Sequence, residues 1–188
     1  LPSCRQHKFK AGLGAMMGYN IVAFVTGMRQ IRRWRPDLIH VHFAVPAGPV
    51  AWLLSKLTGT PYILTTHLGD IPGGAPKKTA GWFRWIYPFT PPIWNQAAQV
   101  VAVSEFSRQL AQKHYPVDIK IIHNGVDTSA LSPGEIKVNH PPQIDFAGRL
   151  MPQKNPLLLV RVLGQLQDLA WHCTILGDGP LMKEIRKE

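Results

Sequence analysis

Short apolar runs alternate with longer helical patterns along most of the chain. Strand-like runs are found at 38–43, 62–66, 99–103, 119–122, 143–147 and 171–176. Helical patterns follow several of them, at 46–57, 105–114 and 156–169, and Pro180 suits the first turn of a last helix that runs to the end of the chain. Strands that alternate with helices are typical of parallel α/β sheets. The pattern therefore predicts an α/β protein with parallel sheets, and 38–43 is expected to be a buried strand.

An uncharged stretch at 11–28 precedes the first predicted strand. It contains four glycines, and lysines and arginines flank it on both sides. We predict a core-facing helix whose C-terminal cations complement the helix dipole. A membrane span is the alternative, although the stretch is barely long enough for one.

A polar, proline-rich segment at 132–142 interrupts the alternation. Such a composition is typical of linkers. We therefore predict a first domain over 1–131, an interdomain linker over 132–142 and a second domain over 143–188.

Charge is distributed unevenly along the chain. The formal net charge is +10, of which residues 1–60 carry +7. A basic N-terminal part favours an anionic partner, such as a lipid headgroup layer, an acidic substrate or a nucleic acid. The two cysteines are far apart, and the first ten residues are too polar for a secretory signal. We expect a cytoplasmic protein, with peripheral attachment to the inner membrane face as an option.

The stretch 144–155 combines a strand, a turn at Gly148, the cations Arg149 and Lys154, and a following helix. Free N–H groups and the dipole of a helix N-terminus attract anions. Arginine adds a bidentate fork and lysine a mobile charge. This arrangement predicts a phosphate or diphosphate site; two solvated cations on an ordinary strand–turn–helix are the alternative.

Other candidate residues follow the predicted strands, at the sheet edge where open parallel sheets bind ligands. These are His67, Gly69, Asp70, Asn124, Gly177, Asp178 and Gly179. His40 and His42 alternate along one strand and so share a face. They could bind a metal ion, but no third ligand is spaced to join them, so we expect no metal site.

The segment 70–92 mixes prolines, aromatic residues and lysines. It could pack on the core as an aromatic helix, lie on a membrane surface, or form a wall for an acceptor sugar. Base stacking is a further option, but no RNA-binding motif accompanies it, so no nucleic-acid partner is expected.

The stretch 148–155 resembles the Gly-Arg-Leu-x-Pro-x-Lys signature of the glycosyltransferase group 1 / family 4 enzymes. Five further stretches resemble that family's other landmarks, in the family's order: 40–42, 67–70, 103–105, 124–127 and 176–180. The resemblance implies the GT-B fold, with two Rossmann-like domains and parallel sheets, both incomplete in this chain.

The resemblance also implies roles for single residues. Arg149 and Lys154, with Gly148, would hold the diphosphate of the donor, and His67 would contact the donor sugar near the reacting carbon as the catalytic candidate. Val103-Ser104-Glu105 would be architectural.

The implied activity is a retaining, hexosyltransferase-type transfer of a sugar from a nucleotide-diphosphate-sugar donor to an acceptor hydroxyl. It would need no metal or other cofactor. The acceptor would be a glycan, a lipid-linked molecule or a small molecule, and we expect a part in polysaccharide or glycoconjugate biosynthesis. A sugar-nucleotide epimerase of the same fold and a non-catalytic module that binds polyanions or membranes are the alternatives.

Two landmarks of the family are not found in the sequence: the Glu-x7-Glu motif and the first strand with its glycine-rich loop. We therefore expect a central fragment of a larger glycosyltransferase that is not catalytically competent by itself.

Overall fold

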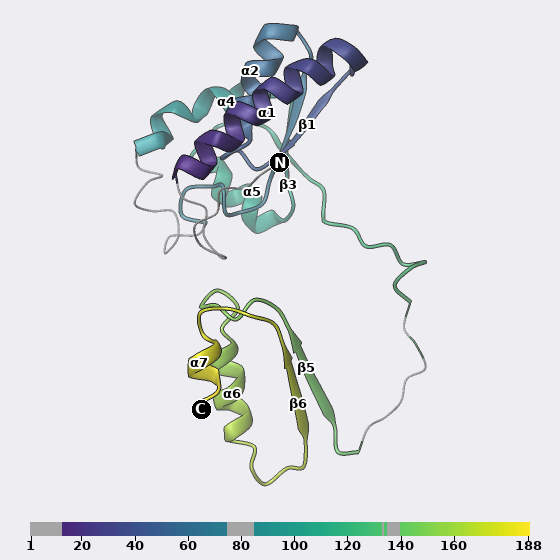
Figure 1. Cartoon of the computed structure of the whole chain (residues 1–188), viewed down its shortest axis with the longest axis vertical. Helices are drawn as coiled ribbons and strands as arrows, with labels where there is room; N and C mark the ends of the chain where they lie inside the picture. Colours follow the sequence, from purple (N-terminus) through teal and green to yellow (C-terminus); the bar gives the residue numbers. More distant parts are fainter. Residues whose placement is uncertain (1–12, 75–84, 133, 135–139) are drawn as a thin grey trace. The chain divides into compact units, whose positions relative to one another are not determined.

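The computed structural model describes residues 13–74, 85–132, 134 and 140–188 (Figure 1). The chain forms two compact units, Leu1–Val126 (unit 1) and Asp127–Glu188 (unit 2). This division lies before the expected domain boundary at 131. The linker over 132–142 stays a prediction, because most of it lies outside the described residues.

Unit 1 is built on a four-stranded parallel sheet. Its strands, in the spatial order of the sheet, are β1 (Ile39–His42), β2 (Tyr62–Thr66), β3 (Gln99–Ala102) and β4 (Ile119–Ile121). All three pairings are parallel, and His42 of β1 is in register with Thr65 of β2. The strands predicted from the apolar runs are confirmed to within a residue or two. Because all four strands are parallel, their carboxyl ends lie at one edge of the sheet.

The helices of unit 1 connect and cover these strands. Within the described ranges they are α1 (Leu13–Trp34), α2 (Gly48–Thr58), the 3-10 helix η1 (Tyr87–Phe89), α4 (Pro91–Asn95) and α5 (Glu105–Gln112). Helix α2 packs on β1 and β2, α5 packs on β3 and β4, and both α1 and α4 pack on α2. The residues 75–84 of the predicted aromatic–basic segment lie outside the described part of the chain. Beyond them, Trp85 and Phe89 are exposed.

The core of unit 1 lies between the sheet and its helices. Alternate strand residues, such as Leu64 of β2 and Val100 of β3, are buried in it together with Trp94 and Tyr115. The rings of Trp94 and Tyr115 stack with centroids 4.2 Å apart. Burial raises the pKa of the Tyr115 hydroxyl to about 12. This hydroxyl is hydrogen-bonded to Thr90 at 2.8 Å, so the polar end of the ring is satisfied inside the core.

Strand β1 is buried on one face only. Val41 lies in the core, whereas His40 and His42 are exposed on the opposite face. The prediction that 38–43 is a buried strand is therefore wrong for four of its six residues, because Leu38, His40, His42 and Phe43 are exposed. The period-two alternation places the two histidines on the face opposite Val41 and the core.

Helix α1 is longer than predicted and is not a core helix. None of its described side chains is buried, and Ile21, Val25 and other apolar residues on its outer face are exposed. Its inner face lies against α2, where a Cβ at Gly27 would come within 2.7 Å of Leu54 Cδ1. The expected core-facing position is wrong, because α1 packs on α2 and contributes no described residue to the buried core. Within the described residues, no helix has the combination of length and apolar character that crossing a membrane requires.

The described residues of unit 2 form two parallel strands and two helices. They are β5 (Gln143–Ala147), α6 (Pro156–Gly164), β6 (His172–Leu176) and α7 (Met182–Ile185). Helix α6 packs on α7. The predicted helix over 156–169 is too long, because the poor helix former Gly164 ends it and the chain continues in turns. The last helix begins at Met182, after Pro180, and ends at Ile185 before the end of the chain.

Candidate functional site

Asp70 joins the two loops that follow β1 and β2. Its carboxylate is buried, with the residue only 2% exposed. One oxygen accepts the backbone N–H of Ala44 at 2.6 Å, and the other accepts the backbone N–H of His67 at 2.9 Å. A buried carboxylate is tolerated only with such partners. Asp70, predicted as a cleft residue, thus fixes the backbone of His67.

Both loops turn through residues with unusual backbone angles. Phe43, directly after β1, and Leu68, two residues after β2, each have φ of 72°. Left-handed conformations are rare for bulky residues and concentrate at functional sites. Gly69 follows in the same turn and is exposed, with its N–H bonded to the carbonyl of His67.

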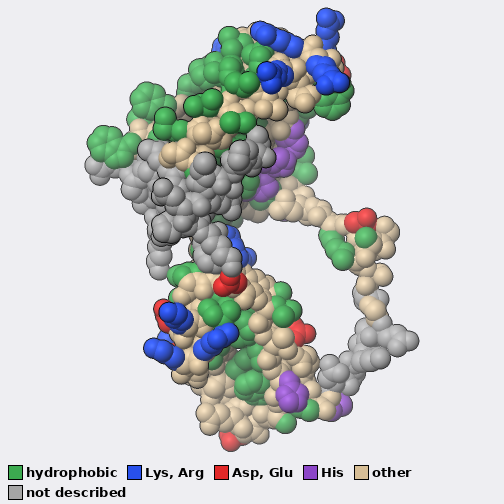
Figure 2. All heavy atoms as spheres, in the orientation of Figure 1, with side chains coloured by type: hydrophobic (Ala, Val, Ile, Leu, Met, Phe, Trp, Pro, Cys, Tyr) green, Lys and Arg blue, Asp and Glu red, His purple; other side chains and the backbone are tan. Residues whose placement is uncertain are grey.

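Three histidines lie together at this edge of the sheet. Nδ1 of His42 and Nε2 of His67 are 2.9 Å apart, a hydrogen-bond distance. Nε2 of His40 is 2.9 Å from Oγ1 of Thr65, and its ring lies 4.4 Å from that of His42. The ring of Phe43 lies 4.6 Å from that of His67. Figure 2 shows histidine side chains gathered on this side of unit 1.

Partial burial lowers the pKa of His40, and the neighbouring His42 and His67 lower it further. Burial and like charge both disfavour the protonated ring. His40 therefore favours the neutral imidazole, which can both donate and accept hydrogen bonds.

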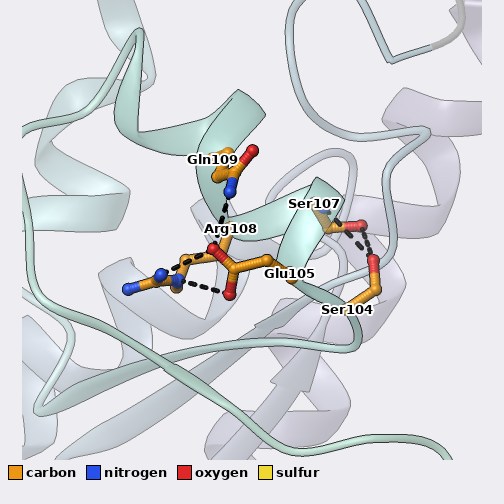
Figure 3. Close-up of polar contacts among 5 residues, drawn as sticks. All are labelled: Ser104, Glu105, Ser107, Arg108 and Gln109. Carbon is orange, nitrogen blue, oxygen red and sulfur yellow. Dashed lines mark hydrogen bonds and ion pairs between the residues drawn. The ribbon is translucent and has the colours of Figure 1, made fainter.

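Ser104 and Glu105, which follow β3 at the same edge, are occupied by local contacts (Figure 3). The Ser104 hydroxyl accepts the N–H of Ser107 at 3.2 Å and so caps α5. Glu105 binds Arg108 through both carboxylate oxygens, at 2.6 and 3.1 Å, and accepts a bond from Gln109. These bonds, with that of Arg108 the strongest, lower the pKa of Glu105. This agrees with an architectural part for the pair.

Asn124 lies beyond β4, at the same edge as His67 but with β3 between their strands. Its side chain is exposed. The preceding His123 places Nδ1 3.1 Å from the carbonyl oxygen of Val103 and so links the turns after β3 and β4.

In unit 2, the loops after β5 and β6 are held together by backbone hydrogen bonds. The N–H of Gly148 donates to Leu176, that of Leu150 to Asp178, and that of Leu181 back to Leu150, at 2.9 to 3.0 Å. The approach is close enough to require glycine. A Cβ at Gly177 would lie 1.9 Å from the carbonyl oxygen of Gly148, and one at Gly179 would lie 2.1 Å from that of Leu150.

We call the two loops, 148–155 after β5 and 177–181 after β6, the double loop. The predicted cations lie in its first part. Arg149 and Lys154 are both exposed, and neither forms an ion pair with any other described residue. Asn155 then adopts a left-handed conformation, and Pro156 begins α6 at its first position. The first N–H groups of α6 therefore face the turn that carries Lys154.

The candidate residues thus form two groups. His67, Gly69, Asp70 and Asn124 lie at the sheet edge of unit 1. The other group, Gly148, Arg149, Lys154 and the turn from Gly177 to Gly179, belongs to unit 2. Across the described ranges, no three His, Cys, Asp or Glu side chains are placed to hold a metal ion.

Sequence reasoning missed the hydrogen bond between His42 and His67. The sequence feature that could have indicated it is the period-two spacing of positions 40 and 42 in one strand and of positions 65 and 67 at the end of the next. That alternation becomes informative only once the register of β1 and β2 is known.

The architecture is similar to that of a solved glycosyltransferase. The structure of TarM from S. aureus, in complex with Fondaparinux, alpha-GlcNAc-glycerol and UDP, aligns with a TM-score of 0.58 at 16% identity. The alignment covers 87% of this chain and 33% of that one. At this identity the likeness shows the fold alone. The predicted fold class, the GT-B fold with two partial α/β domains, is confirmed.

Residues 5–130 match the family model described as Glycosyltransferase Family 4, and the chain belongs to this family. It is 30% identical over 155 residues to TuaC of Bacillus subtilis, whose name assigns it to teichuronic acid biosynthesis. It is also 26% identical over 170 residues to an uncharacterized glycosyltransferase of Methanocaldococcus jannaschii. These alignments cover 77% and 90% of this chain. The chain spans 38% and 44% of the length of these two relatives.

Proposed function

We propose that the protein is a glycosyltransferase that moves a sugar from a nucleotide-diphosphate-sugar donor to an acceptor hydroxyl, with retention at the anomeric carbon. The double loop of unit 2 carries this proposal. It combines two exposed cations, Arg149 and Lys154, with a helix N-terminus and a glycine turn that lets backbone approach backbone. Membership of Glycosyltransferase Family 4 supports the same conclusion.

The donor diphosphate would bind at this double loop. A diphosphate leaving group gains negative charge as its bond to the sugar breaks. Fixed positive charge and N–H groups aimed at that position stabilise the transition state more than the ground state. In this proposal, Arg149 and Lys154 supply that charge without a metal ion.

The reaction would form the new glycosidic bond on the face of the sugar that the diphosphate leaves. The acceptor oxygen attacks the anomeric carbon, the bond from this carbon to the phosphate oxygen breaks, and the leaving phosphate takes the proton of the acceptor hydroxyl. No side-chain nucleophile is needed. His67 would contact the donor sugar near the reacting carbon. The hydrogen bond from its backbone N–H to the Asp70 carboxylate supports this role, because it fixes the backbone of His67.

The acceptor class is also part of the proposal. TarM was solved with a glycan and UDP, and TuaC carries teichuronic acid biosynthesis in its name. A hydroxyl of a glycan or glycoconjugate is therefore the acceptor that we propose. The basic N-terminal part, with a net charge of +7 over residues 1–60, supports peripheral attachment to an anionic membrane surface.

The experiment that tests this function is product analysis by NMR. The complete gene product is incubated with UDP-, GDP- and ADP-sugars and a set of oligosaccharide acceptors, with and without EDTA. We expect a new glycoside whose anomeric configuration matches that of the donor, formed at equal rate in EDTA. An epimerised nucleotide-sugar in place of a glycoside would contradict transfer, an inverted product would contradict retention, and loss of activity in EDTA would contradict the metal-free mechanism.

A further inference from the structure

We propose that His42 is a positioning residue for His67. It would hold the His67 ring in one orientation and one neutral tautomer, so that Nδ1 of His67 is the atom presented to a ligand. This inference rests on the proposed contact of His67 with the donor sugar and adds a second histidine that acts through the first.

The geometry places the two rings in direct contact. Nδ1 of His42 lies 2.9 Å from Nε2 of His67, and the ring centroids are 5.2 Å apart. In a neutral pair, one of these nitrogens carries the hydrogen and the other accepts it. Nε2 of His67 is therefore committed to His42. Nδ1 of His67 has no hydrogen-bond partner among the described residues and is the ring nitrogen available to a ligand.

The contact follows from the register of the sheet. His42 is opposite Thr65 in the parallel pair of β1 and β2, and His67 is the next residue on the same face as Thr65. The backbone of His67 is fixed independently, because its N–H donates to the buried carboxylate of Asp70. With the backbone fixed by Asp70 and Nε2 by His42, the ring has little freedom to rotate.

His42 is itself supported from its other side. The ring of His40 lies 4.4 Å from it, and His40 is 2.9 Å from the hydroxyl of Thr65. Among the described residues, the titratable groups that face the pair are His40, on the same face of β1, and Asp70, which is bonded to the backbone of His67. A partner that fixes the tautomer of a functional histidine is a general device for setting which nitrogen reacts.

Two substitutions at position 42 separate hydrogen bonding from packing. His42→Phe keeps a ring against His40 but has no hydrogen-bonding atom. His42→Asn loses the ring but places an amide atom close to the position of Nδ1. A purely structural role for His42 would be preserved in the Phe variant, whereas a positioning role would be preserved in the Asn variant.

The readout is the pair of ring-nitrogen shifts of His67 in long-range 1H–15N spectra of the 15N-labelled 188-residue chain, recorded where histidines are neutral. A single tautomer gives two widely separated shifts, and a mixture of tautomers gives two averaged shifts. We expect wide separation in the unsubstituted chain and in His42→Asn, and loss of the separation in His42→Phe. His123→Asn, a change at another exposed histidine of unit 1, is the control and should leave His67 unchanged.

Two widely separated His67 ring-nitrogen shifts in His42→Phe would overturn the proposal. Averaged His67 shifts in His42→Asn, with separated shifts in His42→Phe, would also overturn it. Should His42→Phe fail to fold, His67→Phe provides the reciprocal measurement. The His42 shifts must then become averaged, and unchanged His42 shifts would overturn the proposal. Because this readout needs no ligand, it is independent of nucleotide binding in unit 2. Failure of the proposed function is therefore distinguishable from failure of the histidine pair.

Discussion

The buried carboxylate of Asp70 accepts the backbone N–H of His67 at 2.9 Å and, through its other oxygen, that of Ala44 at 2.6 Å. One side chain thereby joins the turn after β1 to the turn after β2. We call this pair of hydrogen bonds the Asp70 clamp. It explains how two loops with left-handed residues, Phe43 and Leu68, keep a defined shape. It also means that Asp70 is needed whether or not it contacts a ligand.

Removal of the Asp70 clamp should destabilise unit 1. Asp70→Ala leaves the buried N–H of Ala44 and the partly buried N–H of His67 without an acceptor. A buried donor left unpaired costs about 1–3 kcal/mol. We expect the free energy of unit 1 opening, measured by hydrogen exchange of protected β2 and β3 amides, to fall by at least about 2 kcal/mol. Asp70→Asn keeps one acceptor and should lose less. Asp37→Asn, at an exposed carboxylate, should change little, and an Asp70→Ala loss no larger than this control would contradict the clamp.

The glycine turn of unit 2 should not tolerate a side chain. A Cβ at Gly177 or Gly179 would overlap the backbone of the loop after β5. We expect Gly177→Ala to lower the opening free energy of the β5 and β6 amides by more than about 2 kcal/mol. The matched control is Gly164→Ala, whose Cβ meets no atom within 4 Å. It should be neutral or stabilising by up to about 1 kcal/mol. Equal effects of the two substitutions would refute the close packing of the loops.

Removal of the Ser104 cap of α5 should destabilise unit 1 by a smaller amount. Ser104→Ala removes the acceptor for the N–H of Ser107 and should cost about 1 kcal/mol of unit 1 stability. Ser104→Asp, which restores a capping oxygen, should recover most of this loss. Urea unfolding followed by circular dichroism measures both variants. If the Asp variant is as unstable as the Ala variant, hydrogen bonding at this position is not the cause.

Stability of unit 1 should depend on pH through His40. Its pKa is lowered in the folded state, by burial first and then by His42 and His67. As the pH falls below the ordinary histidine value of about 6.5, the unfolded chain takes up the proton more readily than the folded chain. Stability is therefore fully present above that value and decreases as the pH falls toward the folded-state pKa. His40→Gln, which can still bond to Thr65, should flatten this dependence between pH 7.5 and 5.5, whereas an unchanged slope would assign it to other groups.

Much of the fold was predictable from local pattern. The β-branched run at 62–66 and the Ser104 cap define β2 and the start of α5, because strand periodicity and helix capping are local properties. The position of α1 was not predictable. Its face toward α2 depends on a close approach at Gly27, which only the tertiary structure determines. For the same reason, the exposure of His40 and His42 depends on which face of the sheet the helices cover.

The candidate site, like the fold, was predictable only in part from the sequence. The proximity of Gly148 and Gly177 follows from a parallel pair of strands whose loops emerge at one edge, so the sequence motifs indicated it. The part that Asp70 plays was missed, because its partners are backbone N–H groups rather than residues of a recognisable motif. Likewise, the contact between His42 and His67 requires the register of two strands.

The most direct measurement is a calorimetric titration of the 188-residue chain with UDP, GDP and ADP. The central claim is that Arg149 and Lys154 bind the diphosphate of a nucleotide. We expect one nucleotide to bind at a single site, and Arg149→Ala or Lys154→Ala each to weaken binding about tenfold or more, as loss of a charge-assisted hydrogen bond predicts. The matched controls Arg186→Ala and Lys187→Ala remove the same charges from exposed positions beyond α7 and should bind as the unsubstituted chain does. Equal affinities in the site and control variants, or no binding of any nucleotide diphosphate, would contradict the account.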